Sequence, residues 1–303
     1  MNFAQYASAA LAATLLLVTA MPARAADEGA TLSPIVRVMT VNAAHGRKDS
    51  LNQLLLGRGS IQSNLGDLAS TLTRSGPDLV ALQEADGPSR WSGSFDHVNA
   101  LARQAGFAWR FRGDHAQSWL YRYGTALLSH LPLTATHSVR FEPSPPSPRK
   151  GFVIGEMRWP GSDEDPGEPR LAVDVVSVHF DYLSQAARER QLRQLTQTLQ
   201  RRSNPRIVLG DFNSEWNAPD SMVQRLASQT TLQAFEPLAA DHATYGERRI
   251  DWILISPEFR FHGYETLPDV ISDHRAVVAD IGLARRPGRP ATAAPPADPQ
   301  AAD

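Results

Sequence analysis

The chain has 303 residues, a formal net charge of −2, 42% hydrophobic residues and 20% charged residues. This composition supports a packed globular core and excludes a chain that is disordered throughout. The near-neutral charge excludes a strong overall positive field for nucleic acid. The absence of cysteine excludes disulfides, thiolate zinc sites and a cysteine nucleophile.

The first 25 residues have the pattern of a secretory signal peptide. Residues 7–21 are apolar, and Ala23-Arg24-Ala25 forms a small-x-small cleavage motif. We expect cleavage after Ala25 and a periplasmic or secreted mature protein. No lysine or arginine precedes the apolar stretch, so an uncleaved anchor is the alternative, although the stretch is shorter than the ~20 residues of a membrane span. We expect no stable membrane span once the signal is removed.

Short apolar runs predict the β-strands of the chain. In chain order these runs cover residues 35–41, 78–82, 124–129, 152–159, 171–180, 207–209, 250–255 and 276–281. Two loops lie among them, the proline-rich segment 143–150 and the acidic segment 160–170.

Three segments have the apolar period of amphipathic helices. Asn64 is the expected N-cap of the first helix, and Asp96 is the expected N-cap of the second. The third is expected to begin at Ser184 and to run to about Arg202. Strands and helices alternate, with several strand–strand neighbours, and this order predicts a layered sandwich with mixed sheets rather than a barrel.

No segment between residues 30 and 283 resembles an interdomain linker, so we expect one domain over residues 30–283. Residues 284–303 are rich in proline and alanine and have no apolar period. We expect them to form a disordered tail.

A polar cluster accompanies most of the predicted strands, usually at the strand end. The clusters are Asn42, Gln83-Glu84, His179, Gly210-Asp211-Phe212-Asn213, Asp251 and Ser272-Asp273-His274. Strand ends that meet at one edge gather distant residues into one pocket. Carboxylate and amide oxygens suit a hard cation such as Mg²⁺, and imidazoles suit proton or charge transfer. The clusters therefore predict metal-assisted hydrolysis of a phosphate ester.

The order of these motifs resembles the endonuclease/exonuclease/phosphatase superfamily, the DNase I-like metal-dependent phosphoesterases, over about residues 35–283. The motifs are Asn42, Leu82-Gln83-Glu84, Gly124-x-Ala126-Leu127-Leu128-Ser129, His179-x-Asp181, Gly210-Asp211-Phe212-Asn213, Asp251-x-Ile253 and Ser272-Asp273-His274. A single Asp or Asn after a strand is more often a turn residue, so the ordered set carries the resemblance. It implies an α/β (α+β) fold, a four-layer α/β/β/α sandwich of two mixed sheets flanked by helices.

The resemblance also implies the metal ligands, which hold Mg²⁺ or Mn²⁺. They are Asn42, Glu84 and Asp273. A carboxylate at a strand end is a plausible direct ligand, and a neighbouring amide can supply a further oxygen.

The catalytic residues implied by the resemblance are His179, Asp211, Asn213, Asp251 and His274. Asp211 is expected to orient or deprotonate the attacking water, and Asn213 to hold a phosphate oxygen. Asp251 is expected to brace His274 as a cation against the phosphoryl group, and His179 to contact phosphate. The sequence leaves open which group is the general base and which is the general acid.

Five further residues are candidates for lining the substrate cleft. They are His45, Trp91, His97, Arg112 and Tyr123. For the segment 91–97 the alternative is a helix cap followed by a core aromatic residue.

The expected function is an exported, metal-dependent phosphoesterase, with phosphodiesterase activity ranked first and water attacking in line at phosphorus. The substrate is a nucleic acid, or a lipid or small-molecule phosphodiester; a lipid substrate would involve transient membrane contact. A phosphomonoesterase acting on a sugar or inositol phosphate is the alternative. A catalytically silent binding module of the same fold is a second alternative, which the presence of Glu84, Asp211 and His274 disfavours. We expect a monomer.

Overall fold

A computed structural model of the protein describes residues 34–50, 53–161, 171–239 and 241–284. The predicted signal peptide, the predicted tail from residue 285 and most of the acidic loop 160–170 lie outside the described residues. All described residues belong to one compact unit. None of the described helices is long and apolar enough to cross a membrane.

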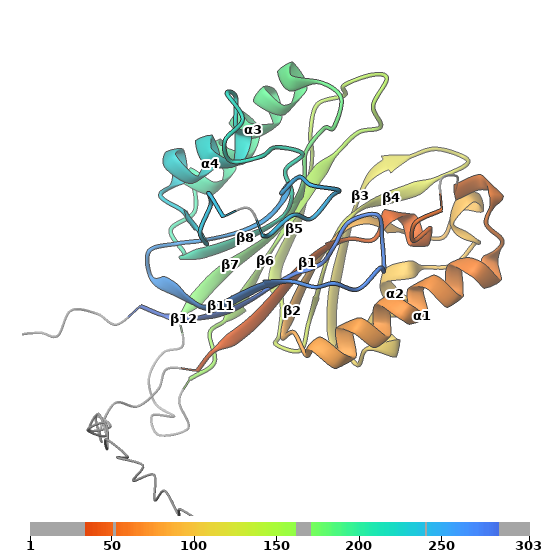
Figure 1. The fold of residues 1–303 in the computed structure, drawn as a ribbon, viewed down its shortest axis with the longest axis horizontal. Helices are drawn as coiled ribbons and strands as arrows, with labels where there is room; N and C mark the ends of the chain where they lie inside the picture. Colours follow the sequence, from red (N-terminus) through yellow and green to blue (C-terminus); the bar gives the residue numbers. More distant parts are fainter. Residues whose placement is uncertain (1–33, 51–52, 162–170, 240, 285–303) are drawn as a thin grey trace, which may run out of the picture. The chain divides into compact units, whose positions relative to one another are not determined.

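Two mixed six-stranded sheets form the centre of the fold (Figure 1). The first sheet has the order β11-β12-β1-β2-β4-β3 and the second has the order β5-β6-β7-β8-β10-β9. The strands of the first sheet are β1 (Val36–Asn42), β2 (Leu79–Asp86), β3 (Trp109–Gln117), β4 (Arg122–Ser129), β11 (Phe259–Thr266) and β12 (Val277–Leu283). Those of the second are β5 (Thr134–Arg140), β6 (Gly151–Arg158), β7 (Ala172–His179), β8 (Arg206–Asp211), β9 (Gln233–Ala234) and β10 (Asp251–Ile255).

Helices cover the outer face of each sheet, and this gives the predicted four layers. The helices are α1 (Arg58–Ser75), α2 (His97–Gln104), α3 (Gln185–Gln200) and α4 (Met222–Thr230), with short 3₁₀ turns η1 (Ala44–Gly46), η2 (Gln53–Leu55) and η3 (Arg90–Ser92). One apolar core joins α1 and α2 to the first sheet. A second core fills the space between the sheets, and a third joins α3 and α4 to the second sheet.

Two of the predicted helix starts are confirmed by their caps. The Asp96 side chain accepts a hydrogen bond from the Asn99 amide, and the Ser184 side chain accepts one from the Ala187 amide. The predicted cap at Asn64 is wrong, because α1 begins six residues earlier, at Arg58. Asn64 lies inside the helix, where its Nδ2 donates to the Gly46 carbonyl.

All eight predicted strands are present, but four strands and one helix were not predicted. The additional elements are β3, β5, β9, β11 and α4. Strands β3, β5, β9 and β11 are the four sheet edges. Edge strands expose more side chains, so their apolar patterns are weaker than those of central strands.

Parallel pairing directs the site residues to one end of the sandwich. Strands β1 and β2 are parallel, with Asn42 opposite Gln83. Strands β7 and β8 are also parallel, with His179 opposite Asp211. The antiparallel neighbour β10 places Asp251, its first residue, opposite Asp211. The carboxyl ends of the parallel strands and the start of β10 therefore meet at the same edge.

Close approach of β7 and β8 requires glycine at position 210. Gly210 has φ +152°, and a Cβ there would lie 2.0 Å from the Val178 carbonyl oxygen. We expect Gly210→Ala to lower the free energy of unfolding by about 2–4 kcal/mol through backbone strain and overpacking. Gly66→Ala in α1 is the matched control, because a Cβ there meets nothing within 4 Å. Urea unfolding of both variants makes the test; equal stabilities would contradict this account of the β7–β8 contact.

Candidate active site

The strand ends of both sheets converge on the Asp211 carboxylate. Asn42, at the end of β1 in the first sheet, donates from Nδ2 to Asp211 Oδ2 at 3.1 Å. His179 Nε2 lies 3.3 Å from the same oxygen, and His274 Nε2 lies 3.8 Å from it. Asn42, which is 169 positions from Asp211 in sequence, therefore meets a carboxylate whose side chain is 2% exposed.

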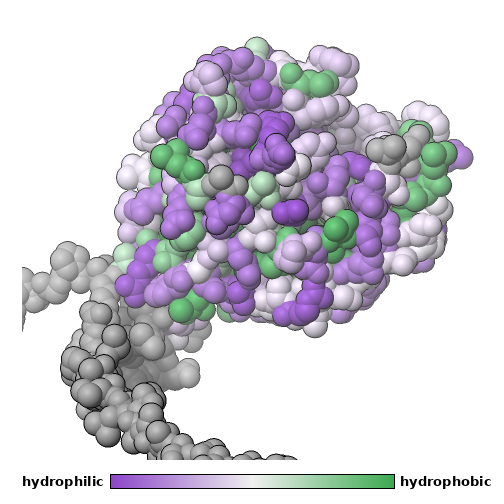
Figure 2. All heavy atoms as spheres, viewed as in Figure 1, coloured by the Kyte–Doolittle hydropathy of each residue, from purple (hydrophilic) through white to green (hydrophobic). Residues whose placement is uncertain are grey.

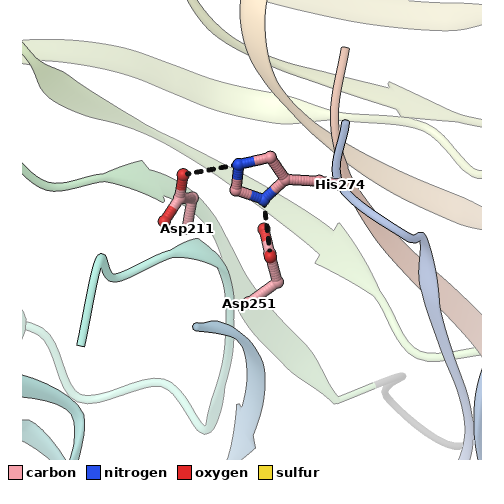
Figure 3. A group of neighbouring side chains, drawn as sticks. All are labelled: Asp211, Asp251 and His274. Carbon is pink, nitrogen blue, oxygen red and sulfur yellow. Dashed lines mark hydrogen bonds and ion pairs between the residues drawn. The ribbon is translucent and has the colours of Figure 1, made fainter. Parts of the chain in front are cut away.

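Asp211, Asp251 and His274 form a compact titratable group at this end (Figure 3). The His274 ring lies between the two carboxylates, with Nδ1 2.8 Å from Asp251 Oδ2. The Tyr245 ring packs against the His274 ring with a centroid separation of 4.8 Å. This is the arrangement predicted for Asp251 as the brace of His274.

The charge states of this group follow from burial and from the proximity of like and unlike charges. Burial alone lowers the pKa of His274, but the charge and hydrogen bond of Asp251 outweigh it and raise the pKa to about 10. Burial and then the charge of Asp251 raise the pKa of Asp211 to about 7. His274 is therefore a cation at neutral pH, and Asp211 exchanges its proton near neutral pH.

His179 differs from His274 in being neutral. Burial and then the charge of Lys150 hold the pKa of His179 well below its usual value. Lys150 Nζ lies 3.4 Å from His179 Nδ1. An ammonium group has hydrogens to donate and no acceptor, so Nδ1 accepts and the ring proton is on Nε2, facing Asp211. His179 can thus donate a hydrogen bond from Nε2 toward the centre of the site.

Glu84 occupies a β-bulge in β2 and has φ +49°. Its two carboxylate oxygens contact His45 Nε2 at 3.1 Å and Lys150 Nζ at 3.4 Å. Burial alone raises the pKa of Glu84, but the charges of His45 and Lys150 outweigh it and hold the pKa well below its usual range. The bulge re-aims the side chain out of the regular pleat. Glu84 is therefore a fixed negative charge at the strand end.

His45 connects Glu84 to a second carboxylate. Its Nδ1 lies 2.8 Å from Asp86 Oδ1, and Trp91 Nε1 donates to the other Asp86 oxygen at 2.8 Å. Burial alone lowers the pKa of His45, but the charges of Glu84 and Asp86 raise it to about 9. Both ring nitrogens face carboxylates, so His45 holds Glu84 in place. It was predicted as a substrate contact.

Trp91 and Tyr123 pack around His45. The Trp91 and Tyr123 rings are stacked at 5.8 Å, and His45 meets each edge-on. Both predicted cleft residues thus pack on His45, the residue that pairs with Glu84.

Arg112 and His97 are not among the residues that contact Asp211 or Glu84. Arg112 pairs with Asp96 at 2.6 Å and with Asp114 at 2.9 Å. His97 is 2% exposed, and its Nε2 is hydrogen-bonded to the Ser92 carbonyl at 2.9 Å. Structural contacts therefore occupy both side chains, and the prediction that they contact substrate does not fit the geometry.

Asn213 and Asp273 lie at the site but are engaged differently from the prediction. The Asn213 side-chain amide donates to the Phe180 carbonyl at 3.1 Å, and its backbone amide donates to Asp211 Oδ1 at 2.9 Å. Asn213 thus fixes the Asp211 side chain as well as the turn. The Asp273 carboxylate pairs with Arg47 and accepts a hydrogen bond from Ser272 Oγ. Arg47 thus contacts one oxygen of Asp273, the predicted metal ligand, and Ser272 contacts the other.

Lys150 is the site residue that the sequence analysis missed. It directly precedes Gly151, which pairs with His179 in the β6–β7 ladder. The sequence feature that could have singled it out is its rarity: Lys48 and Lys150 are the only lysines among 30 Lys and Arg residues.

The residues at this edge fit a divalent cation. The donors of Asp211, Asp251 and His274 lie within 4.8 Å of one another, a spacing that can hold a metal ion. Asp251 Oδ1 is buried and has no hydrogen-bond partner among the described residues. Glu84 is the more open carboxylate, with a side chain 19% exposed against 0% for Asp251. Oxygen donors of this kind suit a hard cation.

Comparison with known proteins agrees with this geometry. A family model described as the Endonuclease/Exonuclease/phosphatase family matches residues 39–274. A search of curated proteins finds no match.

Solved structures share the fold at low sequence identity. An endonuclease/exonuclease/phosphatase from Beutenbergia cavernae DSM 12333 is 20% identical, with a TM-score of 0.62 over 82% of this chain and 72% of that chain. The human nocturnin catalytic domain, with a bound sulfate anion, is 20% identical, with a TM-score of 0.61 over 83% and 94%. A mannosyl-6-phosphatase from Bacteroides thetaiotaomicron VPI-5482 is 15% identical, with a TM-score of 0.61 over 81% and 99%. The family model covers most of the chain, and the chain therefore belongs to the endonuclease/exonuclease/phosphatase family of divalent-metal-dependent phosphoester hydrolases.

Proposed function

We propose that this chain is an exported phosphodiesterase that uses Mg²⁺ or Mn²⁺ to hydrolyse a phosphodiester by in-line attack of water. The observation that carries the proposal is the convergence on Asp211 of an amide from β1 and two imidazoles in opposite charge states. One carboxylate with a pKa of about 7, beside an imidazole that is cationic at neutral pH and a neutral donor, suits general acid–base and electrostatic catalysis at phosphorus.

Each side chain has a distinct role in this proposal. Asp211 accepts a proton from the attacking water and orients it, since its pKa matches neutral pH. Cationic His274, held by Asp251, stabilises negative charge on the phosphoryl oxygens. His179 Nε2–H donates a hydrogen bond to the phosphoryl group or the leaving oxygen. Asn42 holds the Asp211 carboxylate against the first sheet.

Glu84 and the Asn42 amide oxygen would hold the metal ion. The His274 ring lies between Asp211 and Asp251, and its positive charge at neutral pH disfavours a second cation there. Glu84 is ionised and partly exposed. When bound, a divalent cation supplies positive charge to the phosphoryl oxygens.

Removal of divalent metal tests the metal role. We expect EDTA to abolish hydrolysis of bis-p-nitrophenyl phosphate, and Mg²⁺ or Mn²⁺ to restore it, because the metal balances phosphoryl charge. Hydrolysis of p-nitrophenyl phosphate, a monoester, is measured in parallel under the same conditions. Faster turnover of the monoester would favour a phosphomonoesterase, and turnover that survives chelation would contradict the metal assignment.

The surface and the charge of the protein bear on the class of phosphodiester substrate. In the view of Figure 2, hydrophobic side chains are scattered among hydrophilic ones over the surface, and the net charge is −2. On this face the two observations favour no surface for membrane or polyanion binding. A small diester, a nucleic acid strand and a lipid headgroup therefore belong in the same substrate panel.

Export is a separate part of the proposal and rests on residues 1–25. We expect the mature protein in the periplasmic or medium fraction, with an N-terminus at Ala26. N-terminal sequencing of the fractionated protein makes the test. A full-length product confined to the cytoplasm would contradict export and would leave the proposed chemistry unaffected.

A further inference from the structure

Lys150 lies inside the site, between a candidate metal ligand and a histidine. Its Nζ is 3.4 Å from Glu84 Oε1 and 3.4 Å from His179 Nδ1. The side chain is 4% exposed. The ammonium also lies 5.7 Å from the centre of the Tyr182 ring, which belongs to an exposed residue of the loop after β7. A buried ammonium thus contacts both Glu84 and His179.

The backbone fixes the position of this ammonium. The Lys150 carbonyl accepts a hydrogen bond from the Phe141 amide at 3.0 Å. The next residue is Gly151, where a Cβ would lie 2.3 Å from the Val139 carbonyl oxygen. Strand β5 therefore packs closely against the start of β6, and the backbone at Lys150 is held rigidly. Rigid placement is what a group that acts on a substrate requires.

The ammonium has donor capacity that the described residues do not use. A lysine offers three hydrogens, and Nζ has two hydrogen-bonding partners in the described part of the chain. A buried polar hydrogen without a partner costs free energy. An anionic oxygen in front of the ammonium would satisfy it.

We propose that Lys150 binds a non-bridging oxygen of the substrate's phosphoryl group, next to His179. This inference rests on the proposed function, since it assigns a residue to the same phosphoryl group. Lysine suits the position because its ammonium is a compact charge that can bind Glu84, His179 and a phosphate oxygen together. Lys150 is then a catalytic residue in direct contact with substrate, and its positive charge stabilises the transition state.

Binding of inorganic phosphate to the Mn²⁺-loaded protein tests the proposal without requiring turnover. We expect Lys150→Met to weaken phosphate binding by about 10-fold or more, the worth of one charged hydrogen bond. Mn²⁺ binding should be kept or strengthened, because the substitution removes a positive charge 3.4 Å from Glu84. Lys150→Arg retains the charge and should recover part of the phosphate affinity. Calorimetry measures both affinities, and thermal unfolding shows whether each variant is folded.

Lys48→Met is the matched control, because it removes the chain's other lysine. Lys48 Nζ pairs with Asp67 at 2.9 Å on the surface, and this variant should bind phosphate as the wild type does. In turnover of bis-p-nitrophenyl phosphate, Lys150→Met should lower kcat by about 100-fold, as for removal of an oxyanion donor.

The outcomes separate this inference from the proposed function. Unchanged phosphate affinity in folded Lys150→Met, or no phosphate binding by the wild type, would overturn the role of Lys150. Loss of phosphate binding in Lys150→Met, in a protein that hydrolyses no ester, would support Lys150 as a phosphate ligand and overturn the proposed function. Normal hydrolysis and phosphate binding in Lys150→Met would overturn the inference alone.

Discussion

Asp211→Asn is expected to lower kcat by at least about 100-fold, because it removes the proposed proton acceptor for water. Asparagine keeps the shape of the side chain but cannot accept a proton from water near neutral pH. It also loses the negative charge that faces His179 and His274. The measurement is metal-supported hydrolysis of bis-p-nitrophenyl phosphate, with saturating substrate so that kcat is separated from KM.

Asp67→Asn provides the matched control for this substitution. Asp67 lies in α1, and its side chain is 52% exposed and pairs with Lys48. The control should keep the wild-type rate within about twofold, since exposed ion pairs contribute little. Near-wild-type turnover by folded Asp211→Asn would remove Asp211 from the catalytic site and with it the proposed reaction centre.

The second large loss of kcat is expected when the Asp251–His274 pair is disrupted. His274→Gln should lower kcat by about 100-fold to 1000-fold, because it removes a preorganised cation from the phosphoryl group. His137→Gln, on the exposed edge strand β5, is the matched control and should behave as the wild type. A His274→Gln enzyme as active as the control would contradict the electrostatic role.

We expect Asp251→Asn to change the pH dependence of kcat. Burial lowers the pKa of His274, and the Asp251 charge raises it to about 10, so the cation persists until the pH rises through that value. Without the Asp251 charge the pKa of His274 falls, and the alkaline loss of kcat should move to lower pH. The acidic part of the profile depends on Asp211, which Asp251 also influences, so the alkaline limb is the informative one. An unmoved alkaline limb would contradict the assigned charge state of His274.

The central strands and the order of the site residues were predictable from the sequence. Runs such as 171–180 and 250–255 are mostly apolar because both faces of the strand are covered. Strand β7 ends at His179 and β10 begins at Asp251, and the parallel pairs β1–β2 and β7–β8 place the polar strand ends at one edge. The family resemblance then supplied the layer order, which the two sheets and their covering helices confirm.

The elements that the sequence analysis missed had either a weak local pattern or one that was overlooked. The edge strands β3 and β11 have weak apolar alternation, since they are partly exposed. The helix α4 was missed although Ser221 caps it and Met222, Val223 and Leu226 are buried on one side; its pattern was present in the sequence.

Side-chain partners were the least predictable part of the site. His45 looked like a cleft residue because it follows Asn42, but Asp86 and Glu84 occupy both its ring nitrogens. Asp273 sits in a recognisable motif, yet Arg47 from the β1–α1 loop pairs with it. Lys150 carries no motif of its own and reaches the site only through the register of β6 with β7. Such pairings are set by tertiary packing and not by spacing.

The most direct test of the central claim is a hydrolysis panel for the purified protein and for Asp211→Asn, assayed side by side with Mg²⁺ and with Mn²⁺. The panel holds duplex and single-stranded DNA, RNA, sphingomyelin, inositol phosphates and bis-p-nitrophenyl phosphate. The account predicts that the wild type cleaves at least one phosphodiester and that Asp211→Asn loses at least about 99% of that rate. Cleavage by both proteins at the same rate, or by neither protein on any member, would contradict a phosphodiesterase centred on Asp211.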